Sequence, residues 1–208
     1  MIQSPTNNVI VQVKHKWIRH ISDMLRRVEI NNDASVRQVD FVNIIGDVVS
    51  VPKKIENIRQ FNGFSTKEIK TGDKVIFSYS VISELVETQL EIPLYKNRIW
   101  YKGQEFFVAS LDNVFAVIRG EEIKMVNGFV MITPFETNKI ILPQHMKQVR
   151  SCCKAEVMQI GSPKETEKCI DAKQGETVYF NPNKVQKYEI NGKKFCILQQ
   201  SHILGKEI

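Results

Sequence analysis

The sequence has no apolar run of about twenty residues, which is the length that a membrane-spanning helix needs. We therefore expect no membrane span. The N-terminal region also lacks the apolar centre of a signal peptide, because Lys14, His15 and Lys16 stand where that centre would be. From these absences we expect a protein that is not exported and that works in the cytoplasm.

Cysteine is scarce as well. The four cysteines lie in the C-terminal part of the chain, at Cys152, Cys153, Cys169 and Cys196. None of them are spaced as C-x-x-C, and two adjacent cysteines suit neither a disulfide framework nor a standard zinc site. His145 and His202 would complete a metal site only if the fold happened to gather them. We expect reduced, structural cysteines and no metal.

The familiar motifs of catalysis are absent. The chain has no nucleotide-binding glycine pattern, no G-x-S-x-G elbow and no H-E-x-x-H motif. The four histidines have no obvious acid partner, so each fits a surface or packing role better than a catalytic one. We expect a protein that is not an enzyme and that needs no cofactor.

Positive charge exceeds negative charge but is not concentrated. The formal net charge is +6, and the lysines and arginines are spread along the whole sequence, which is typical of a solvated surface. Lys14, Lys16 and Arg19 stand near Trp17, and this basic and aromatic group leaves a nucleic-acid-binding barrel as an alternative. We favour the solvated surface and expect no nucleic-acid partner.

What the sequence does contain is a series of short, strand-like segments divided by turns. They include residues 9–13, 41–51, 75–77, 99–108, 129–132 and 156–160. Short strands with regular turn signals favour a barrel or a sandwich. Residues 17–28 differ, because Ile18, Ile21 and Leu25 recur at helical spacing. The prediction is an all-β protein with one short helix inserted in its first part.

The segments of the first part recur in the same order in the second part. Residues 47–52 resemble 156–161, residues 69–77 resemble 172–180, and residues 110–115 resemble 199–204. Gly72 and Gly175 stand in matching turns 103 positions apart (175 − 72), and hairpins centred on Gly103 and Gly192 also match. Repeats in register predict two copies of one small β-domain, at residues 1–120 and 121–208, with a polar join near Gly120.

One loop of the second copy carries three adjacent aliphatic residues, Ile140, Ile141 and Leu142, followed by Pro143. Three adjacent side chains cannot all face one core from a strand, because neighbours in a strand alternate between faces. Pro143 also disfavours a continuing helix. The segment therefore fits a loop that docks its apolar residues into a groove on a partner. A buried half-strand that ends at the proline is the alternative.

The repeated segments resemble the GroES family, the ten-kilodalton co-chaperonins. The family pattern is a strand before a mobile loop, a K-x-G-D-x-V-x-F segment, a closing hairpin and an S-D-I-L-like tail. The matching stretches are residues 70–77 and 112–115 in the first copy, and residues 173–180, 190–192 and 201–204 in the second. Together they cover most of the chain, at low identity and with insertions in the first copy. The resemblance implies two tandem GroES-like β-barrels.

In that family the mobile loop ends in an aliphatic tripeptide that binds a groove on the rim of the chaperonin cage. Ile140, Ile141 and Leu142 stand at this place, so the resemblance implies that they contact a GroEL-type cage. The first copy has no such tripeptide, and Ile18, Ile21 and Leu25 stand there as a secondary contact, unless that helix packs on its own barrel. The family's roof hairpin is implied at Phe61, Asn62, Gly63 and Phe64.

The implied function is a co-chaperonin that forms a ring and caps a chaperonin cage during ATP-dependent folding. Rings of this family pair the first strand of one subunit with the last strand of the next, here residues 9–13 and 129–132 with residues 114–118 and 203–204. Tandem forms resemble the double co-chaperonins of plastids, and unusual loops occur in phage-encoded ones, for which the compartment would be the host cytoplasm. A virion or scaffold protein that kept the fold without binding a chaperonin is the alternative function.

Overall fold

A computed structural model describes the fold. It describes residues 2–14, 44–56, 67–82, 85–86, 93–94, 97–135, 153–162, 171–190 and 193–207. The described part is built from β-strands, and its helical turns are three-residue 3-10 segments. Among the described residues, no helix is long and apolar enough to cross a membrane. The predicted all-β fold class is confirmed, whereas the helix predicted at residues 17–28 lies outside the described residues.

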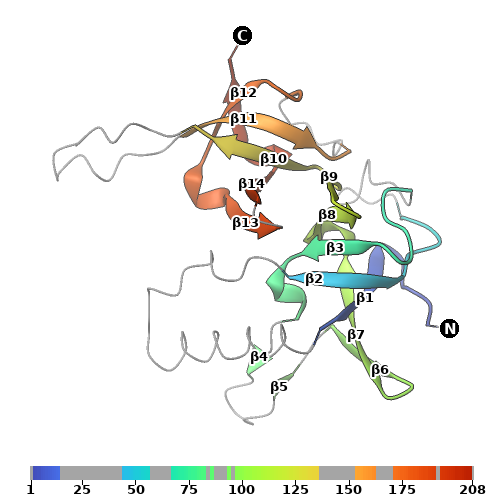
Figure 1. The fold of residues 1–208 in the computed structure, drawn as a ribbon. Coiled ribbons are helices and arrows are strands. Elements are labelled where there is room, and N and C mark those ends of the chain that lie inside the picture. Colours follow the sequence, from blue (N-terminus) through green and yellow to red (C-terminus); the bar gives the residue numbers. More distant parts are fainter. Residues whose placement is uncertain are drawn as a thin grey trace.

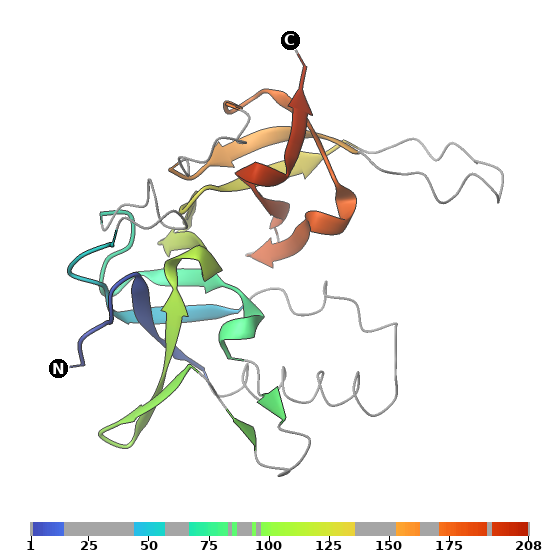
Figure 2. The ribbon, with the colours of Figure 1, turned by 180° about the vertical axis from the view of Figure 1, so that it is seen from behind.

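The strands form two main sheets that lie one above the other in Figures 1 and 2, with the N-terminus on the lower sheet and the C-terminus on the upper one. Sheet 1 has the order β6-β7-β1-β2-β3-β8-β9, and sheet 2 has the order β13-β14-β10-β11-β12-β15. The strands of sheet 1 are β1 (Asn8–Val13), β2 (Ile45–Ser50), β3 (Lys74–Phe77), β6 (Arg98–Tyr101), β7 (Gln104–Ser110), β8 (Val114–Arg119) and β9 (Glu122–Met125). The strands of sheet 2 are β10 (Phe129–Pro134), β11 (Cys153–Ile160), β12 (Thr177–Phe180), β13 (Gln186–Ile190), β14 (Lys193–Gln199) and β15 (Ile203–Lys206).

The remaining elements are short. Strands β4 (Leu85–Val86) and β5 (Pro93–Leu94) make a two-stranded ribbon beside sheet 1. The 3-10 turns are η3 (Tyr79–Val81), η4 (Leu111–Asn113), η6 (Pro182–Lys184) and η7 (Gln200–His202). Lys102 and Gly103 join β6 to β7 with positive φ angles of 50° and 73°, as a two-residue hairpin turn requires. The predicted hairpin around Gly103 is confirmed.

Each sheet wraps around its own apolar core, because alternate side chains of its strands point to the same side. In sheet 1 this core joins residues from five strands, among them Val9, Val48, Val75, Phe107 and Val117. In sheet 2 the corresponding core joins Val130, Val157, Val178, Leu198 and Ile203. Each half of the chain therefore has a hydrophobic core of its own.

A third apolar cluster joins the outer faces of the two sheets. Its fully or nearly buried members are Ile76, Phe115, Ala116, Met125, Phe129, Tyr188, Phe195 and Ile197. The ring centroids of Phe115 and Phe129 lie 4.5 Å apart, and those of Phe115 and Tyr188 lie 6.4 Å apart. Tilted and edge-to-face aromatic pairs at these separations are favourable. We call this group the inter-sheet cluster.

The two sheets have the same pairing register throughout. Strand β1 corresponds to β10 with an offset of 121, because Val9 pairs with Ala109 where Val130 pairs with Leu198 (130 − 9). Strands β7 and β8 correspond to β14 and β15 with an offset of 89, β2 to β11 with an offset of 109, and β3 to β12 with an offset of 103. Bulges fall at equivalent points, after Ile10 and after Met131. These offsets equal the spacings between the matching segments of the sequence.

The turns before β3 and β12 correspond as well. Gly72 and Gly175 have φ angles of 91° and 84°, and each donates its N–H to the strand beside it, to Val48 and Val157, at 2.8 Å. The next residue closes each turn with its carboxylate, which accepts the N–H of Lys70 or Lys173 at 2.7 Å. Glycine is required at these two places because φ is positive.

The polar stretch after Gly120 includes a strand, because Glu122–Met125 forms β9 and pairs with β8 as the last strand of sheet 1. The division into domains at residues 1–120 and 121–208 stays a prediction. One expectation from the sequence is wrong, because β1 and β10 do not offer a free edge to another subunit. Strand β1 lies between β7 and β2, and β10 lies between β14 and β11. Within the chain, the segment before β10, which is β9, pairs with β8.

Candidate functional site

The residues that the sequence singles out lie outside the described residues. This holds for the tripeptide Ile140, Ile141 and Leu142, for Ile18, Ile21 and Leu25, and for the roof residues Phe61, Asn62, Gly63 and Phe64. The structure describes the strands from which these segments leave.

The segment with the tripeptide connects two neighbouring strands. Strand β10 ends at Pro134, β11 begins at Cys153, and the two are antiparallel, with Pro134 opposite Ala155. Beyond the last pair, the N–H of Phe135 donates to the carbonyl of Lys154 at 3.1 Å, which extends the ladder by one hydrogen bond. The two ends of the connection are therefore held side by side. Phe135 is 46% exposed at this stem.

Charged and aromatic side chains fix the strand at the start of β11. Lys154 forms an ion pair with Glu207, and Tyr179 donates its hydroxyl to the same carboxylate at 2.9 Å. The ammonium of Lys154 also lies 5.0 Å from the centre of the Tyr179 ring, within the range of a cation–π contact. The hydrogen bond to Glu207 raises the pKa of Lys154, and the same bond lowers the pKa of Glu207. Both groups stay charged at neutral pH, so the stem keeps this contact.

Sheet 1 has an equivalent connection between β1 and β2. It runs from Lys14 to Ile44, whose counterparts in sheet 2 are Phe135 (offset 121) and Cys153 (offset 109). Between these equivalent ends it spans 31 residues (44 − 14 + 1), against 19 (153 − 135 + 1) in sheet 2. The segment with Ile18, Ile21 and Leu25 thus belongs to the counterpart of the tripeptide loop.

The tripeptide loop and the connection from β11 to β12 lie at opposite ends of β11. The loop enters β11 at Cys153, whereas the chain leaves β11 after Ile160 toward the next turn. An eight-residue strand spans roughly 26 Å. In Figure 1 the two ends of β11 lie on opposite sides of the upper sheet. The point where the tripeptide loop joins β11 is therefore separated from the point where the next connection leaves it by the length of the strand.

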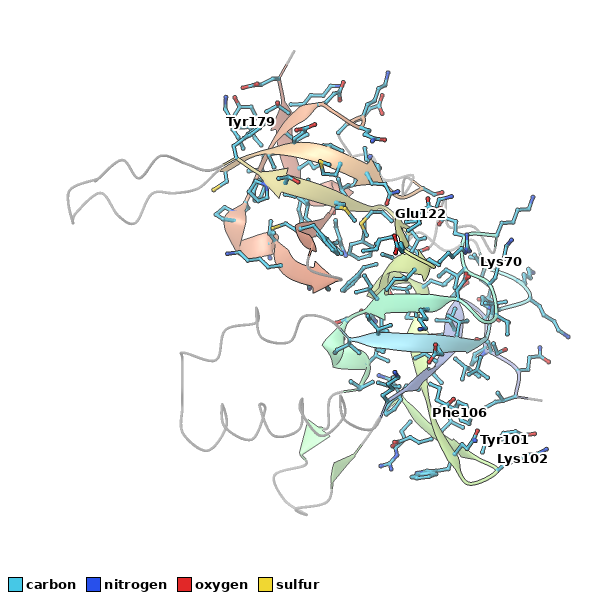
Figure 3. The ribbon with its side chains drawn as sticks, in the orientation of Figure 1. Lys70, Tyr101, Lys102, Phe106, Glu122 and Tyr179 are labelled. Atoms are coloured by element: carbon cyan, nitrogen blue, oxygen red, sulfur yellow. The ribbon has the colours of Figure 1, made fainter. Side chains whose placement is uncertain are left out.

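A cavity of about 540 Å³ opens between β9 and the outer face of sheet 2. Its walls are apolar on the side of sheet 2, where Met131, Met158 and Phe195 lie, and acidic at Glu121 and Glu122. Figure 3 places Glu122 between the two sheets. Within the described residues there is no group of three or more side chains that would hold a metal ion. The cavity thus offers apolar contact and two carboxylates.

Polar contacts from one glutamate also tie the two halves together. Glu68, which precedes β3, accepts hydrogen bonds from the hydroxyl of Ser162, which follows β11, and from the N–H of Asn127 at 3.4 Å. The side-chain amide of Asn127 donates to the carbonyls of Leu111 and Val114 at 2.6 and 3.0 Å. Together with the inter-sheet cluster, these bonds fix the connection between the sheets. No local pattern in the sequence indicates these hydrogen bonds.

Comparison with known families agrees with the second half of this architecture. Residues 122–207 match the family described as the chaperonin 10 Kd subunit. The match covers 86 of the 208 residues (207 − 122 + 1), from the first residue of β9 to the end of β15. No curated protein matches the chain. The β-rich structure of this half fits the GroES-like fold, and the chaperonin 10 match indicates a co-chaperonin type of function.

The chaperonin 10 match includes the connection between β10 and β11, and so the residues Ile140, Ile141 and Leu142. It does not include sheet 1 up to β8. The segment with Ile18, Ile21 and Leu25 and the segment with Phe61 to Phe64 both lie in that unmatched half. The tripeptide is thus the predicted contact that falls inside the matched family domain.

Proposed function

We propose that the protein is a co-chaperonin that closes a chaperonin cage through Ile140, Ile141 and Leu142 and so assists ATP-dependent protein folding. The observation that carries the proposal is the chaperonin 10 match over residues 122–207, which includes a long connection between two paired strands with three adjacent aliphatic residues in it. The proposed partner is a GroEL-type cage, the proposed compartment is the cytoplasm, and no enzymatic activity is proposed.

The energetics favour a contact that many copies make together. Burial of an aliphatic side chain contributes about 1.5–3 kcal/mol, so three give roughly 4–9 kcal/mol before costs. Ordering a flexible segment on binding costs about 2–5 kcal/mol. One loop would thus bind weakly, and several loops on one assembly would bind well through avidity. A lid that is released in each cycle needs this combination, so we propose that the protein self-associates into a ring.

We also propose that residues 1–120 form a second, divergent domain of the same kind. The support is the common strand order of the two sheets and their common register, down to the position of the bulge in the first strand. In this domain the segment with Ile18, Ile21 and Leu25 takes the part of the tripeptide loop, and Phe61, Asn62, Gly63 and Phe64 form the roof. The tandem form and a phage origin remain parts of the proposal.

A chaperonin-binding experiment tests the lid. The protein is mixed with a GroEL-type chaperonin and nucleotide, and the ATP turnover of the chaperonin and capped particles in negative-stain images are recorded. Wild type should lower the turnover and cap the particles. Ile141→Asp should abolish both effects, because a charge cannot enter an apolar groove without a large desolvation cost.

Val149→Asp is the matched control, since it adds the same charge to an apolar residue of the same connection outside the tripeptide. It should behave as wild type. Circular dichroism of both variants should match that of wild type. Full binding by Ile141→Asp would exclude the tripeptide as the contact, and absence of binding by wild type would favour the scaffold function instead.

A further inference from the structure

The cavity between β9 and the outer face of sheet 2 has no role in the proposed lid. We propose that it is a binding site for a short, extended peptide that carries apolar side chains and lysine or arginine. The peptide would add to the free edge of β9 and lie against the outer face of sheet 2. This inference goes beyond the proposed function, because it needs neither a chaperonin nor a ring. Size, exposure, backbone geometry and charge all support it.

The size and the lining of the cavity suit a ligand. Its volume of about 540 Å³ lies within the range of roughly 300–1,000 Å³ that is typical of ligand sites. Met131, Met158 and Phe195 line it on the outer face of sheet 2, and Ile123 lines it on β9. Ligand sites are mostly apolar, with a few polar groups that orient the ligand. The lining therefore has the composition of a binding site.

The apolar wall of the cavity is exposed and continues along sheet 2. Met158 is 41% exposed and Phe135 is 46% exposed, although both are large apolar residues. Met131 and Thr133 line the cavity from β10, and Phe135 follows two residues later. Side chains two residues apart in a strand share a face, so these three residues form one row. A ligand several residues long would cover this row, which a small molecule would not.

A free strand edge borders the cavity. The N–H of Val126 donates to the carbonyl of Phe115 at 3.1 Å, so this pair of residues is hydrogen-bonded. In an antiparallel ladder, such pairs alternate with pairs that share no hydrogen bond. The N–H and the carbonyl of Ile123 therefore point away from β8, on the side where β9 ends sheet 1 as described. Edges of this kind accept an extended peptide as a further strand.

The neighbouring amide shows that this edge of β9 faces sheet 2. The N–H of Met125 points to the same side as that of Ile123, and it donates to the side-chain oxygen of Gln159 on β11 at 2.8 Å. One end of the edge is therefore already paired within the chain. A peptide would pair from Ile123 toward Glu121, another residue that lines the cavity.

The charge of the cavity favours a cationic peptide. Glu121 and Glu122 line it, and none of the described residues in its lining is basic. The nearby guanidinium of Arg119 already donates two hydrogen bonds to Asp73. Figure 3 shows Glu122 between the two sheets. A lysine or arginine of the peptide would therefore pair with these carboxylates.

The two sides of β9 define the pattern of the peptide. Ile123 and Met125 pack in or against the inter-sheet cluster, and Glu122 points to the opposite face because neighbours in a strand alternate. A peptide strand beside β9 would have the same two faces. Apolar residues that alternate with lysine therefore match this edge, with the apolar ones toward Met131 and Phe195.

Binding of synthetic peptides to the full chain tests the site. The probe is fluorescein-labelled Leu-Lys-Val-Lys-Leu, and the comparison peptide is Leu-Glu-Val-Glu-Leu; fluorescence anisotropy measures both. The lysine peptide should bind at one site per chain and at least about tenfold more tightly. Unspecific attraction would favour the glutamate peptide instead, because the net charge of the protein is +6. Equal binding of the two peptides, or tighter binding of the glutamate peptide, would overturn the proposal.

Met158→Lys tests the position of the site. It replaces an exposed apolar residue of the cavity by a positive charge, and it should weaken binding of the lysine peptide at least about tenfold. Leu204→Lys is the matched control, because Leu204 is a 58% exposed apolar residue of β15 outside the cavity. It should bind the peptide as wild type does. Circular dichroism of both variants should match wild type, and equal binding by the two variants would overturn the proposal.

Methylated peptides test the strand edge. Directly opposed residues share a face, so the valine of the probe would lie opposite Ile123 and exchange both backbone hydrogen bonds with it. N-methylation of this valine should weaken binding at least about tenfold, whereas N-methylation of the lysine after it, whose N–H points away from β9, should not. Equal affinity of the two methylated peptides would overturn the pairing with β9. None of these measurements involves a chaperonin, so their outcome is independent of the lid.

Discussion

Arg119 donates two parallel hydrogen bonds to the carboxylate of Asp73, from Nε to Oδ1 at 2.9 Å and from Nη2 to Oδ2 at 2.7 Å. The same Nη2 donates to the carbonyl of Glu68 at 2.9 Å. The guanidinium therefore ties the end of β8 to the turn before β3, a turn that Figure 3 marks by Lys70. Its hydrogen bond to the carboxylate holds the pKa of Asp73 below the usual value of 3.8.

Arg119→Ala should lower the free energy of unfolding by at most about 1 kcal/mol, because a bidentate pair at the surface lies at the upper end of the range for exposed ion pairs. Urea denaturation measures the change. Lys154→Ala is the control, since it breaks an ion pair in which both side chains are about half exposed, together with a cation–π contact to Tyr179 that is weak at an exposed site. It should lower the stability less. An equal or larger loss in Lys154→Ala would contradict the role assigned to Arg119.

The dependence of the free energy of unfolding on pH in the acidic range should also depend on the pair of Arg119 and Asp73. A carboxyl group whose pKa is lower in the folded than in the unfolded protein stabilises the fold above its unfolded pKa, and this contribution is lost as pH falls through the folded pKa. Wild type should therefore lose stability below pH 3.8 through Asp73. Arg119→Ala should lose less over that range. Thermal unfolding between pH 5 and 2 checks this, and parallel curves for the two proteins would refute it.

Phe115→Ala should uncouple the two sheets. Phe115 is 4% exposed and contacts the rings of Phe129 and Tyr188, so its truncation leaves a cavity in the inter-sheet cluster. Replacing a buried phenylalanine by alanine costs about 3–5 kcal/mol. We expect that loss in urea denaturation, together with a transition that divides into two steps. Trp100→Ala, at a 61% exposed site, should change the stability by less than about 0.5 kcal/mol. A single, unshifted transition in Phe115→Ala would show that the cluster does not couple the sheets.

Gly161→Ala should disturb the segment that joins the sheets. A Cβ at Gly161 would lie 2.6 Å from the carbonyl carbon and 2.7 Å from the Cα of Val126, both of them backbone atoms that cannot rotate away. Overpacking of this kind costs about 1–3 kcal/mol, which thermal or urea unfolding would detect.

Gly205→Ala is the matched control for that substitution. Its Cβ would meet nothing nearer than Tyr179 Cδ2 at 4.0 Å, and alanine already occupies the equivalent position of sheet 1 at Ala116. It should leave the stability nearly unchanged. If Gly161→Ala leaves the stability equally unchanged, the backbone around Val126 must be able to shift without loss of stability.

The division of both halves into short strands and turns follows from local signals in the sequence. Positive-φ glycines such as Gly72 and Gly175, and the residues that follow them, mark the same turn twice. Because such turns are set by a few adjacent residues, they can be read without knowledge of the tertiary structure. The spacings between matching segments therefore agree with the ladder registers.

The pairing of the sheets with one another could not be read in this way. Strand β9 has only four residues, Glu122 to Met125, and its alternation of charged and apolar residues is too short to predict the pairing with β8. From the sequence, Phe115 and Phe129 would each be assigned to the core of its own half. In the structure, both lie in the inter-sheet cluster, on the outer faces of their sheets. Such a contact depends on how two finished sheets meet, which no local pattern encodes. The predicted tripeptide contact lies outside the described residues and stays a prediction.

The position of β9 also limits where the chain can be divided into separately expressed fragments. The strand hydrogen-bonds along β8, yet the Met125 amide is held by Gln159 of the other half. A fragment that ends at residue 120 would leave the edge of β8 unpaired and prone to aggregate. A fragment that starts at residue 129 would expose the aromatic side chains of the inter-sheet cluster to solvent. When the two halves are expressed separately, residues 122–125 should therefore be included in both fragments.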